Sequence, residues 1–390
     1  MKPPFIAFLA IPLLLLGSSA NAQIKTTDIN TINTAVPFLR IAPDARSGAM
    51  GDVGIAVSED ADATYWNPAK LAFAKKDMAI GVTYTPWLKQ LVNDIYLAHL
   101  SAYKKVDKNS AIGASLRYFS LGNIQFTNYQ GDPIGDFRPR ELAFDLDYSR
   151  LLSKHLSVAL ALRYIYSNLA AGQSVNGVQV NAANGVATDV SAYYKKDIKM
   201  SNSKKGLFSL GLSMTNLGTK MTYTKTATNK DYLPANLGLG SAFKMDIDKY
   251  NSLEFGLDIN KLLVPTPDLN DQTLAYQNKS PLSGALGSFN DAPGGMKEEF
   301  KEINYSAGIE YWYINQFAVR AGYFFEDPSK GNRKYLTVGV GVKYSVLCLN
   351  FSYLVPTSGV QKSPLDNTLR FSLLFDLQNA EKGNTTPATI

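Results

Sequence analysis

The stretch from Glu141 to Ser149, ELAFDLDYS, alternates without interruption between large apolar residues and residues that are polar or small. Successive side chains of a β-strand point to opposite faces, so one face of this strand is apolar and the other carries carboxylates. Residues 208–215, 253–260, 336–343 and 369–376 repeat the pattern. Strands of this kind suit a wall that separates lipid from a polar interior.

The connections between such stretches indicate the architecture. From Met78 onward about fourteen alternating segments follow one another, joined by short and long connections in turn. The short connections are residues 104–110, 153–155, 201–205, 246–250, 314–315 and 344–346. The long ones are residues 122–139, 170–184, 218–233, 263–300, 326–333 and 356–366, and only residues 87–91 break the rule by being short. This layout predicts an all-β fold, a transmembrane barrel of about 14 antiparallel strands over residues 78–377.

The polar faces of these strands distinguish a barrel from a soluble β-sandwich. A sandwich would expose faces rich in Lys, Glu and Thr, whereas here charges appear singly among Gly, Ala and Ser. The charges expected to face the lumen are Glu141, Asp145, Asp147, Arg163, Glu254, Asp258, Arg320 and Arg370. Because buried charges need partners, we expect acids and bases to pair across the lumen in a network that stiffens the barrel. A charged transport path is the alternative.

The two ends of the chain differ from the barrel. An apolar run over residues 5–16 follows a lysine and leads to small residues ending at Ala22. This pattern predicts a secretory signal peptide of residues 1–22, cleaved before Gln23. The mature protein is therefore expected to be integral to the outer membrane, with its short turns in the periplasm and its long loops outside. Residues 378–390 are expected to form a polar C-terminal tail.

Residues 23–77, between the cleavage site and the first strand, are too many for a simple tail. Gly48 and Gly51 let the backbone turn tightly. Asn67 is a good N-cap and Pro68 suits a first helical position, so a short helix is predicted over residues 68–74. A compact segment ahead of a barrel is best interpreted as a plug of the lumen. The residues expected to carry it are Gly48, Gly51, Asp52, Trp66, Asn67 and Pro68.

Two motifs carry a resemblance to known families. Gly-Ala-Met-Gly-Asp at residues 48–52, followed by Trp-Asn-Pro-Ala at residues 66–69, resembles the hatch signature of FadL-type outer-membrane proteins, which are fourteen-stranded barrels plugged by their N-terminus. The blocks at residues 84–88 and 91–95 resemble, more specifically, the PorV family of the type IX secretion system. Pro86, Trp87, Leu88, Asn93 and Asp94 carry that second resemblance. One departure is that the chain runs past Leu377 into a polar tail, whereas many barrels stop at an aromatic residue.

The resemblance implies a function in secretion. Proteins of this kind take cargo that bears a C-terminal domain from the translocon barrel of the outer membrane and present it to the surface sortase and attachment complex. The long loop over residues 263–300 is expected to contribute a docking surface, because Leu282, Leu286 and Phe289 form an apolar stretch unusual for exposed loops. A lid over the barrel mouth is the other interpretation of this loop. The FadL resemblance alone implies an alternative function, transport of long-chain fatty acids or other hydrophobic compounds.

Features of catalysis are lacking in the sequence. Its only histidines, His99 and His155, have no accompanying Ser-His-Asp spacing or cluster of metal ligands. We therefore expect no enzymatic activity, no catalytic, cofactor-binding or metal-binding residues and no cofactor. The net charge of +6 is too dispersed for a nucleic-acid partner. The single cysteine, Cys348, excludes a disulfide within the chain and is expected to be a lumen thiol.

Overall fold

The structure is a computed structural model that describes residues 29–88, 92–128, 130–175, 177–200, 205–225, 230–269, 271, 273–357 and 368–377. The expected signal peptide, its cleavage site and the polar C-terminal tail lie outside these residues. In the described part of the chain, no helix is both long enough and apolar enough to cross a membrane.

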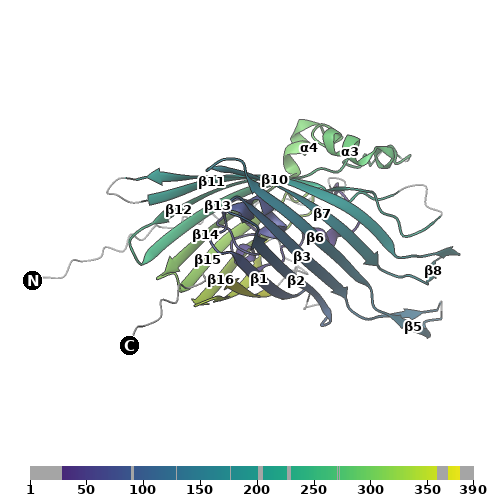
Figure 1. Ribbon diagram of the computed structural model, residues 1–390. Helices are drawn as coiled ribbons and strands as arrows, with labels where there is room; N and C mark the ends of the chain where they lie inside the picture. Colours follow the sequence, from purple (N-terminus) through teal and green to yellow (C-terminus); the bar gives the residue numbers. More distant parts are fainter. Residues whose placement is uncertain are drawn as a thin grey trace, which may run out of the picture.

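Fourteen of the described strands close into an antiparallel barrel, which confirms the predicted fold (Figure 1). They are β1 (Met78–Pro86), β2 (Ile95–Lys105), β3 (Ser110–Leu121), β6 (Arg140–Leu151), β7 (Leu156–Asn168), β10 (Ala183–Lys199), β11 (Lys205–Gly218), β12 (Asn236–Asp246), β13 (Asn251–Leu262), β14 (Ile303–Tyr313), β15 (Phe317–Phe325), β16 (Lys334–Tyr344), β17 (Leu347–Pro356) and β18 (Leu369–Leu377). The first and last of these strands close the barrel, with Met78 opposite Leu377 and Tyr84 opposite Phe371. Closure satisfies the hydrogen-bonding groups that a strand edge would otherwise present.

The long connections carry structure of their own. One holds the small hairpin of β4 (Ile124–Thr127) and β5 (Pro133–Phe137), and the next holds β8 (Ser174–Val175) and β9 (Val178–Gln179). Both hairpins lie at the same end of the barrel (Figure 1). Long connections therefore gather at one end, which is here called the rim.

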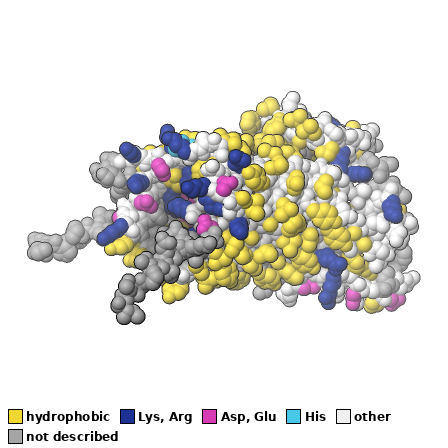
Figure 2. All heavy atoms as spheres, viewed as in Figure 1, with side chains coloured by type: hydrophobic (Ala, Val, Ile, Leu, Met, Phe, Trp, Pro, Cys, Tyr) yellow, Lys and Arg dark blue, Asp and Glu magenta, His cyan; other side chains and the backbone are white. Residues whose placement is uncertain are grey.

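The two faces of the wall follow the sequence alternation. In β6, Phe144, Leu146 and Tyr148 are 41%, 53% and 46% exposed, whereas the intervening Asp145 and Asp147 are buried. Figure 2 shows the exposed apolar side chains as a band across one face of the barrel, with charged side chains mostly toward its two ends, and exposed apolar residues on the other strands continue this belt. An apolar belt on a closed barrel is the surface that the hydrocarbon of a bilayer requires.

The N-terminal segment over residues 29–77, called the plug from here on, fills the interior of the barrel (Figure 1). It contains η2 (Pro37–Arg40), α1 (Ala45–Gly48), α2 (Ala63–Trp66) and η3 (Pro68–Phe73). The helix predicted from Pro68 forms as a 3₁₀-helix, and Asn67 caps it by accepting a 3.1 Å hydrogen bond from the backbone N–H of Ala69. Met50 and Val53 pack in one cluster with the wall residue Tyr193, so plug and wall share their core.

The connection between β13 and β14 forms a small helical unit of η5 (Ala275–Asn278), α3 (Pro281–Gly287) and α4 (Met296–Lys301). Ala285 of α3 packs with Ala235 and Leu263 and against Met214 and Leu237, whose side chains point outward from β11 and β12. Figure 1 shows α3 and α4 to one side of the barrel. The helix α3 therefore lies beside the outer wall near the rim and not across the mouth of the barrel.

Candidate functional site

Arg46 of α1 joins the plug to the wall through a shared carboxylate. Its Nε and Nη2 donate to the two oxygens of Glu310 on β14 at 2.9 and 2.8 Å. Its Nη1 donates to Asp60 at 2.8 Å, and Glu254 of β13 lies 3.4 Å from Nη2. Arg320 of β15 also donates to Glu310, at 2.6 Å. Charge-assisted, two-pronged contacts of this kind are strong and directional, so they hold the plug in one register.

A second charged cluster lies within the wall itself. Asp145 of β6 accepts from Arg163 Nε on β7, from Arg117 Nη2 at 3.2 Å and from Ser115 Oγ at 2.7 Å. Arg163 Nη2 in turn donates to Asp189 of β10 at 2.8 Å. These pairs connect four neighbouring strands and match the stiffening network expected from the sequence.

Asp258 and Arg370, two further expected lumen charges, contact the plug. Asp258 Oδ2 accepts from the backbone N–H groups of Gly54 and Ile55 at 2.7 and 2.9 Å, and Arg370 Nε donates to the carbonyl of Ala42 at 3.1 Å. Among the eight charges named from the sequence, only Asp145 and Arg163 pair with each other within the described residues. Acid–base pairs between wall strands therefore form around Asp145 and Glu310, whereas Glu254, Asp258 and Arg370 take partners from the plug.

Besides Asp258, two expected lumen carboxylates form no salt bridge in the described part of the chain. Glu141 accepts a 2.7 Å hydrogen bond from Ser167 Oγ. Both carboxylate oxygens of Asp147 are buried without a hydrogen-bond partner among the described residues. Neither residue contributes to attachment of the plug.

The plug glycines mark places where plug and wall approach closely. Gly51 has a φ of +71°, and a Cβ there would lie 2.6 Å from the backbone oxygen of Tyr323 on β15. Gly48 faces the side chain of Arg370, whose Cδ would be 2.9 Å from an added Cβ. Only a residue without a Cβ fits the left-handed backbone and the close approach at Gly51.

The polar and aromatic residues of the plug motif hold its fold. Asp52 accepts a 2.5 Å hydrogen bond from the Tyr335 hydroxyl of the wall. Trp66 donates from Nε1 to Asp44 at 2.7 Å, which links two plug helices. Asn67 donates to the carbonyl of Ile55 at 3.1 Å, and to a wall carbonyl on β10 at the same distance. The motif therefore serves packing and attachment.

The described residues of the block at residues 86–94, namely 86–88 and 92–94, lie at the two ends of the connection between β1 and β2. Trp87 donates its backbone N–H to the carbonyl of Ile95 at 2.9 Å, and its ring packs against the apolar cluster of η2. Leu88 has a φ of +52°, which turns the chain. Asp94 accepts from the backbone N–H of Asn123 at 2.7 Å, bracing the next connection. Pro86 ends β1, and the neighbouring Asn93 is exposed beside Asp94.

The helical unit at the rim is fastened by buried ion pairs. Lys261 of β13 contacts Glu299 at 2.9 Å and Glu302 at 2.6 Å. Lys330, in the next connection, contacts Glu298 at 2.5 Å and Glu302 at 3.0 Å. Burial alone would raise the pKa of Glu299, but its hydrogen bond from Lys261 and its backbone hydrogen bonds hold the pKa below its ordinary value. The unit is thus pinned to the barrel at α4.

The outward face of this unit is apolar. Leu282 and Leu286 of α3 are 67% and 68% exposed, and Phe289 is 45% exposed. Met296 and Phe300 of α4 are also exposed. These five side chains, Leu282, Leu286, Phe289, Met296 and Phe300, are here called the apolar rim face. Patches of this kind usually mark interaction surfaces.

A hollow of about 450 Å³ lies on the outer wall along β10, β11, β12 and β13. The small side chains of Ala192 and Ser241 form its floor between bulkier neighbours such as Tyr194 and Leu212. The helix α3 packs on two of the same strands, β11 and β12. The hollow and the apolar rim face therefore occupy the same sector of the barrel.

Sequence reasoning missed several residues that matter in these clusters. Arg117 and Asp189 occupy lumen-facing positions of alternating strands, so extending the alternation along β3 and β10 would have found them. Glu310 could have been found in the same way on β14. Arg46 carries no such signal, because the plug has no regular period.

A closed barrel with an apolar belt and a lumen filled by its own N-terminal segment defines the class, a plugged outer-membrane β-barrel. Residues 24–269 match the family described as "Type IX secretion system protein PorV". The chain belongs to this PorV family, an outer-membrane family of the type IX secretion system. A search of curated proteins found no match.

Solved structures that resemble this chain include two toluene transporters and a FadL homologue. The P. putida toluene transporter TodX is 14% identical, with a TM-score of 0.49 and coverage of 86% of this chain and 98% of that one. The Ralstonia pickettii toluene transporter TbuX is 10% identical, with a TM-score of 0.47 and coverage of 85% and 97%. A Pseudomonas aeruginosa FadL homologue is 9% identical, with a TM-score of 0.43 and coverage of 89% and 99%.

Proposed function

We propose that this protein is a docking barrel of the type IX secretion system. It receives cargo bearing a C-terminal domain from the translocon barrel and presents that cargo to the surface sortase and attachment complex. Membership of the PorV family supports the secretion context. The observation that carries the docking role is the apolar rim face, which is exposed yet fastened to the wall by ion pairs of α4.

Rigid attachment matters for docking because ordering a loose loop on binding costs free energy. Lys261 and Lys330 hold the carboxylates of α4, and Ala285 packs α3 against the wall. Leu286 and Phe289 are consequently presented on a preformed surface. Large apolar side chains that enter a partner's pocket commonly dominate the binding free energy of an interface.

The outer-wall hollow supports a partner within the membrane. It lies on the strands that carry α3, so one partner can contact both surfaces at once. A neighbouring barrel, such as the translocon, presents a matching lipid-facing wall. We therefore assign the translocon barrel to the β10–β13 sector, and cargo and sortase to the other parts of the rim.

The described lumen favours docking over transport of fatty acids. A FadL-like transporter needs an apolar route through or around its plug. Here Arg46, Asp258 and Arg370 join the plug to the wall through buried polar contacts, beside the apolar clusters that plug and wall share. A hydrophobic solute would have to displace these buried charged contacts, which is energetically expensive.

Deleting the gene in the native host tests the secretion role. We expect cargo with a C-terminal domain to accumulate in the periplasm or remain unprocessed. Normal secretion combined with impaired uptake of long-chain fatty acids would contradict the proposal and support the transporter function.

The docking surface itself is tested by the double variant Leu286→Ser/Phe289→Ser. We expect co-purification of the translocon barrel to fall at least about tenfold, since two anchoring side chains each contribute on the order of 1–2 kcal/mol. The matched control is Ile124→Ser/Val178→Ser, which removes two exposed apolar side chains from the β4–β5 and β8–β9 hairpins. Equal recovery of the translocon barrel with both double variants would contradict the assignment.

A further inference from the structure

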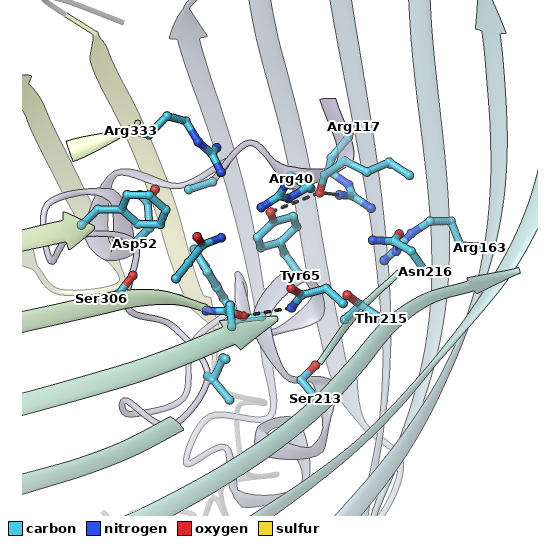
Figure 3. A pocket seen from close by; sticks show the side chains of 18 of the residues that line it. Arg40, Asp52, Tyr65, Arg117, Arg163, Ser213, Thr215, Asn216, Ser306 and Arg333 are labelled. Atoms are coloured by element: carbon cyan, nitrogen blue, oxygen red, sulfur yellow. Dashed lines mark hydrogen bonds between the residues drawn. The ribbon is translucent and has the colours of Figure 1, made fainter. Parts of the chain in front are cut away.

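A small cavity lies inside the barrel on the rim side of the plug. Its volume is about 100 Å³, and side chains from η2, the plug turns and the wall line it (Figure 3). Arg40, Arg117 and Arg333 lie along one side of the view, and Ser213, Thr215 and Ser306 lie along the other. The cavity therefore combines guanidinium groups with hydroxyl groups at close quarters.

The arginines of this cavity are unequally matched by carboxylates. Arg333 donates from Nε and Nη2 to the two oxygens of Glu326, each at 2.8 Å. Arg40 reaches the same carboxylate only at 4.0 Å, and its guanidinium donates no hydrogen bond within the described residues. Burial and the nearby guanidinium of Arg333 lower the pKa of Arg40 to about 10. Arg40 thus remains protonated at neutral pH without a full counter-charge.

Further donors at the cavity are buried without a partner. Arg117 is only 1% exposed, and its Nε has no hydrogen-bond partner among the described residues. The same holds for the hydroxyl of Ser213, which is 2% exposed. Buried polar atoms normally find partners, so unmatched donors lining one cavity point to a ligand with acceptor oxygens.

One acidic group also lines the cavity. Asp52 accepts a hydrogen bond from the Tyr335 hydroxyl at 2.5 Å and lies 3.7 Å from Arg370 Nη2. These contacts direct its carboxylate toward its own partners. Arg117 keeps its Nη2 on Asp145, so the guanidinium of Arg40 and the Nε of Arg117 remain available to an incoming anion.

We propose that this cavity binds a single oxyanion group, a phosphate or a carboxylate, through Arg40 and Arg117 with the hydroxyl of Ser213. Guanidinium groups match the planar oxygens of such anions and form charge-assisted hydrogen bonds. The side chain of Arg40 is 26% exposed, so solvent reaches the cavity from the rim side.

Size restricts what enters. Pockets that enclose drug-sized ligands are about 300–1,000 Å³, several times larger than this cavity of about 100 Å³. The cavity accordingly holds the charged group alone. That group is either a free anion or the terminal group of a larger molecule whose remainder stays at the barrel mouth.

Calorimetric titration of the purified full-length barrel in detergent tests the site with inorganic phosphate, acetate and glucose 1-phosphate. Saturable binding above that of chloride at equal ionic strength is expected for phosphate or acetate. If glucose 1-phosphate binds as tightly as phosphate, the natural ligand is the terminal group of a larger molecule. If glucose 1-phosphate does not bind while phosphate does, the ligand is a free anion.

The variant Arg40→Gln is expected to weaken phosphate or acetate binding at least about tenfold, because it removes one charged partner of the anion. Arg140→Gln is the matched control, since Arg140 is exposed at the rim end of β6. The affinity of this control variant for phosphate or acetate should equal that of the unmodified protein. Absence of saturable binding, or equal affinities for the Arg40→Gln variant and the unmodified protein, overturns the proposal. The assay contains no secretion partner, so its outcome is independent of the docking role.

Discussion

Arg46 lies in the plug, but its side chain contacts two wall residues that are distant in the sequence. Glu254 and Glu310 are 208 and 264 residues away from it in the chain. Attachment of the plug thus depends on single side chains with distant partners. Loss of one member of a buried ion pair leaves the other member uncompensated, which is more costly than loss of both.

Replacing Arg46 with Ala tests this attachment. We expect about 3–5 kcal/mol less stabilisation of the plugged state, because Glu310 and Glu254 lose a buried partner. The measurement is ion conductance in planar bilayers, where the variant should show frequent openings and the unmodified protein few. Lys154→Ala, in an exposed turn, is the control. A variant at Arg46 that stays closed would show that other contacts hold the plug.

Gly51 and Gly131 offer a matched pair of substitutions. Both have positive φ, +71° and +89°, so replacement with Ala costs each about 1–2 kcal/mol of backbone strain. Only at Gly51 would the new Cβ also meet the backbone of Tyr323, whereas nothing lies within 4 Å at Gly131. Thermal unfolding in detergent should therefore show the larger loss for Gly51→Ala. Equal losses of thermal stability in the two variants would mean that the plug moves away from Tyr323 without losing free energy.

At the scale of elements, the wall strands and the helical unit at the rim differ in how they are held. The strands are fixed by a continuous ladder, whereas α4 depends on the ion pairs of Lys261 and Lys330 with its carboxylates. Alternation predicts such strands well, because the polarity of each residue indicates whether its side chain faces the lipid or the lumen. The helices α3 and α4 escape prediction as elements, because their seven and six residues are too short for a clear helical period.

The ion pairs of α4 predict a pH dependence. The pKa values of Glu298 and Glu299 in the folded protein lie below the ordinary value of 4.5, because lysine contacts outweigh burial. Their stabilisation is therefore complete above pH 4.5 and is lost as the pH falls through the lower, folded values. Hydrogen exchange of α4, corrected for intrinsic rates, should accelerate at pH 3 relative to pH 7.

The variant Lys261→Met provides the control for that measurement. It removes the partner of Glu299, so exchange in α4 should already be fast at pH 7 and change less on acidification. Unchanged protection of α4 at pH 3 in the unmodified protein would mean that packing, not charge, fastens the unit.

At the scale of the whole molecule, the plug divides the lumen into two compartments. The arginine cavity lies toward the rim, and a larger hollow of about 640 Å³, lined by Cys348, lies at the end of the short turns. Alternation and turn lengths were sufficient to predict the barrel, its strand number and the lumen position of Asp145 and Arg163. The partners of Asp258 and Arg370 were not predictable, because they belong to a plug whose path depends on tertiary contacts.

The single cysteine tests the proposed orientation of the barrel. Cys348 is 9% exposed and borders this hollow, so a membrane-impermeant maleimide should label it slowly after the outer membrane is permeabilised but not in intact cells, since the short turns are expected to face the periplasm. Cys348→Ser should abolish labelling. Efficient labelling of intact cells would contradict the proposed orientation. A conductance measurement on the same cells shows whether the reagent instead entered through an open barrel.

The plug precedes its wall partners in the sequence, so it is synthesised before them. Residues 46, 51 and 54 leave the inner membrane first, whereas Glu310, Thr337 and Asp258, which hold them, come from later strands. Contacts between distant parts of a chain form slowly, since the intervening chain must first be ordered. The segment that is exported first is thus locked last. We therefore expect the nascent barrel to pass through an unplugged stage during assembly, in which the machinery that inserts it has to seal the membrane.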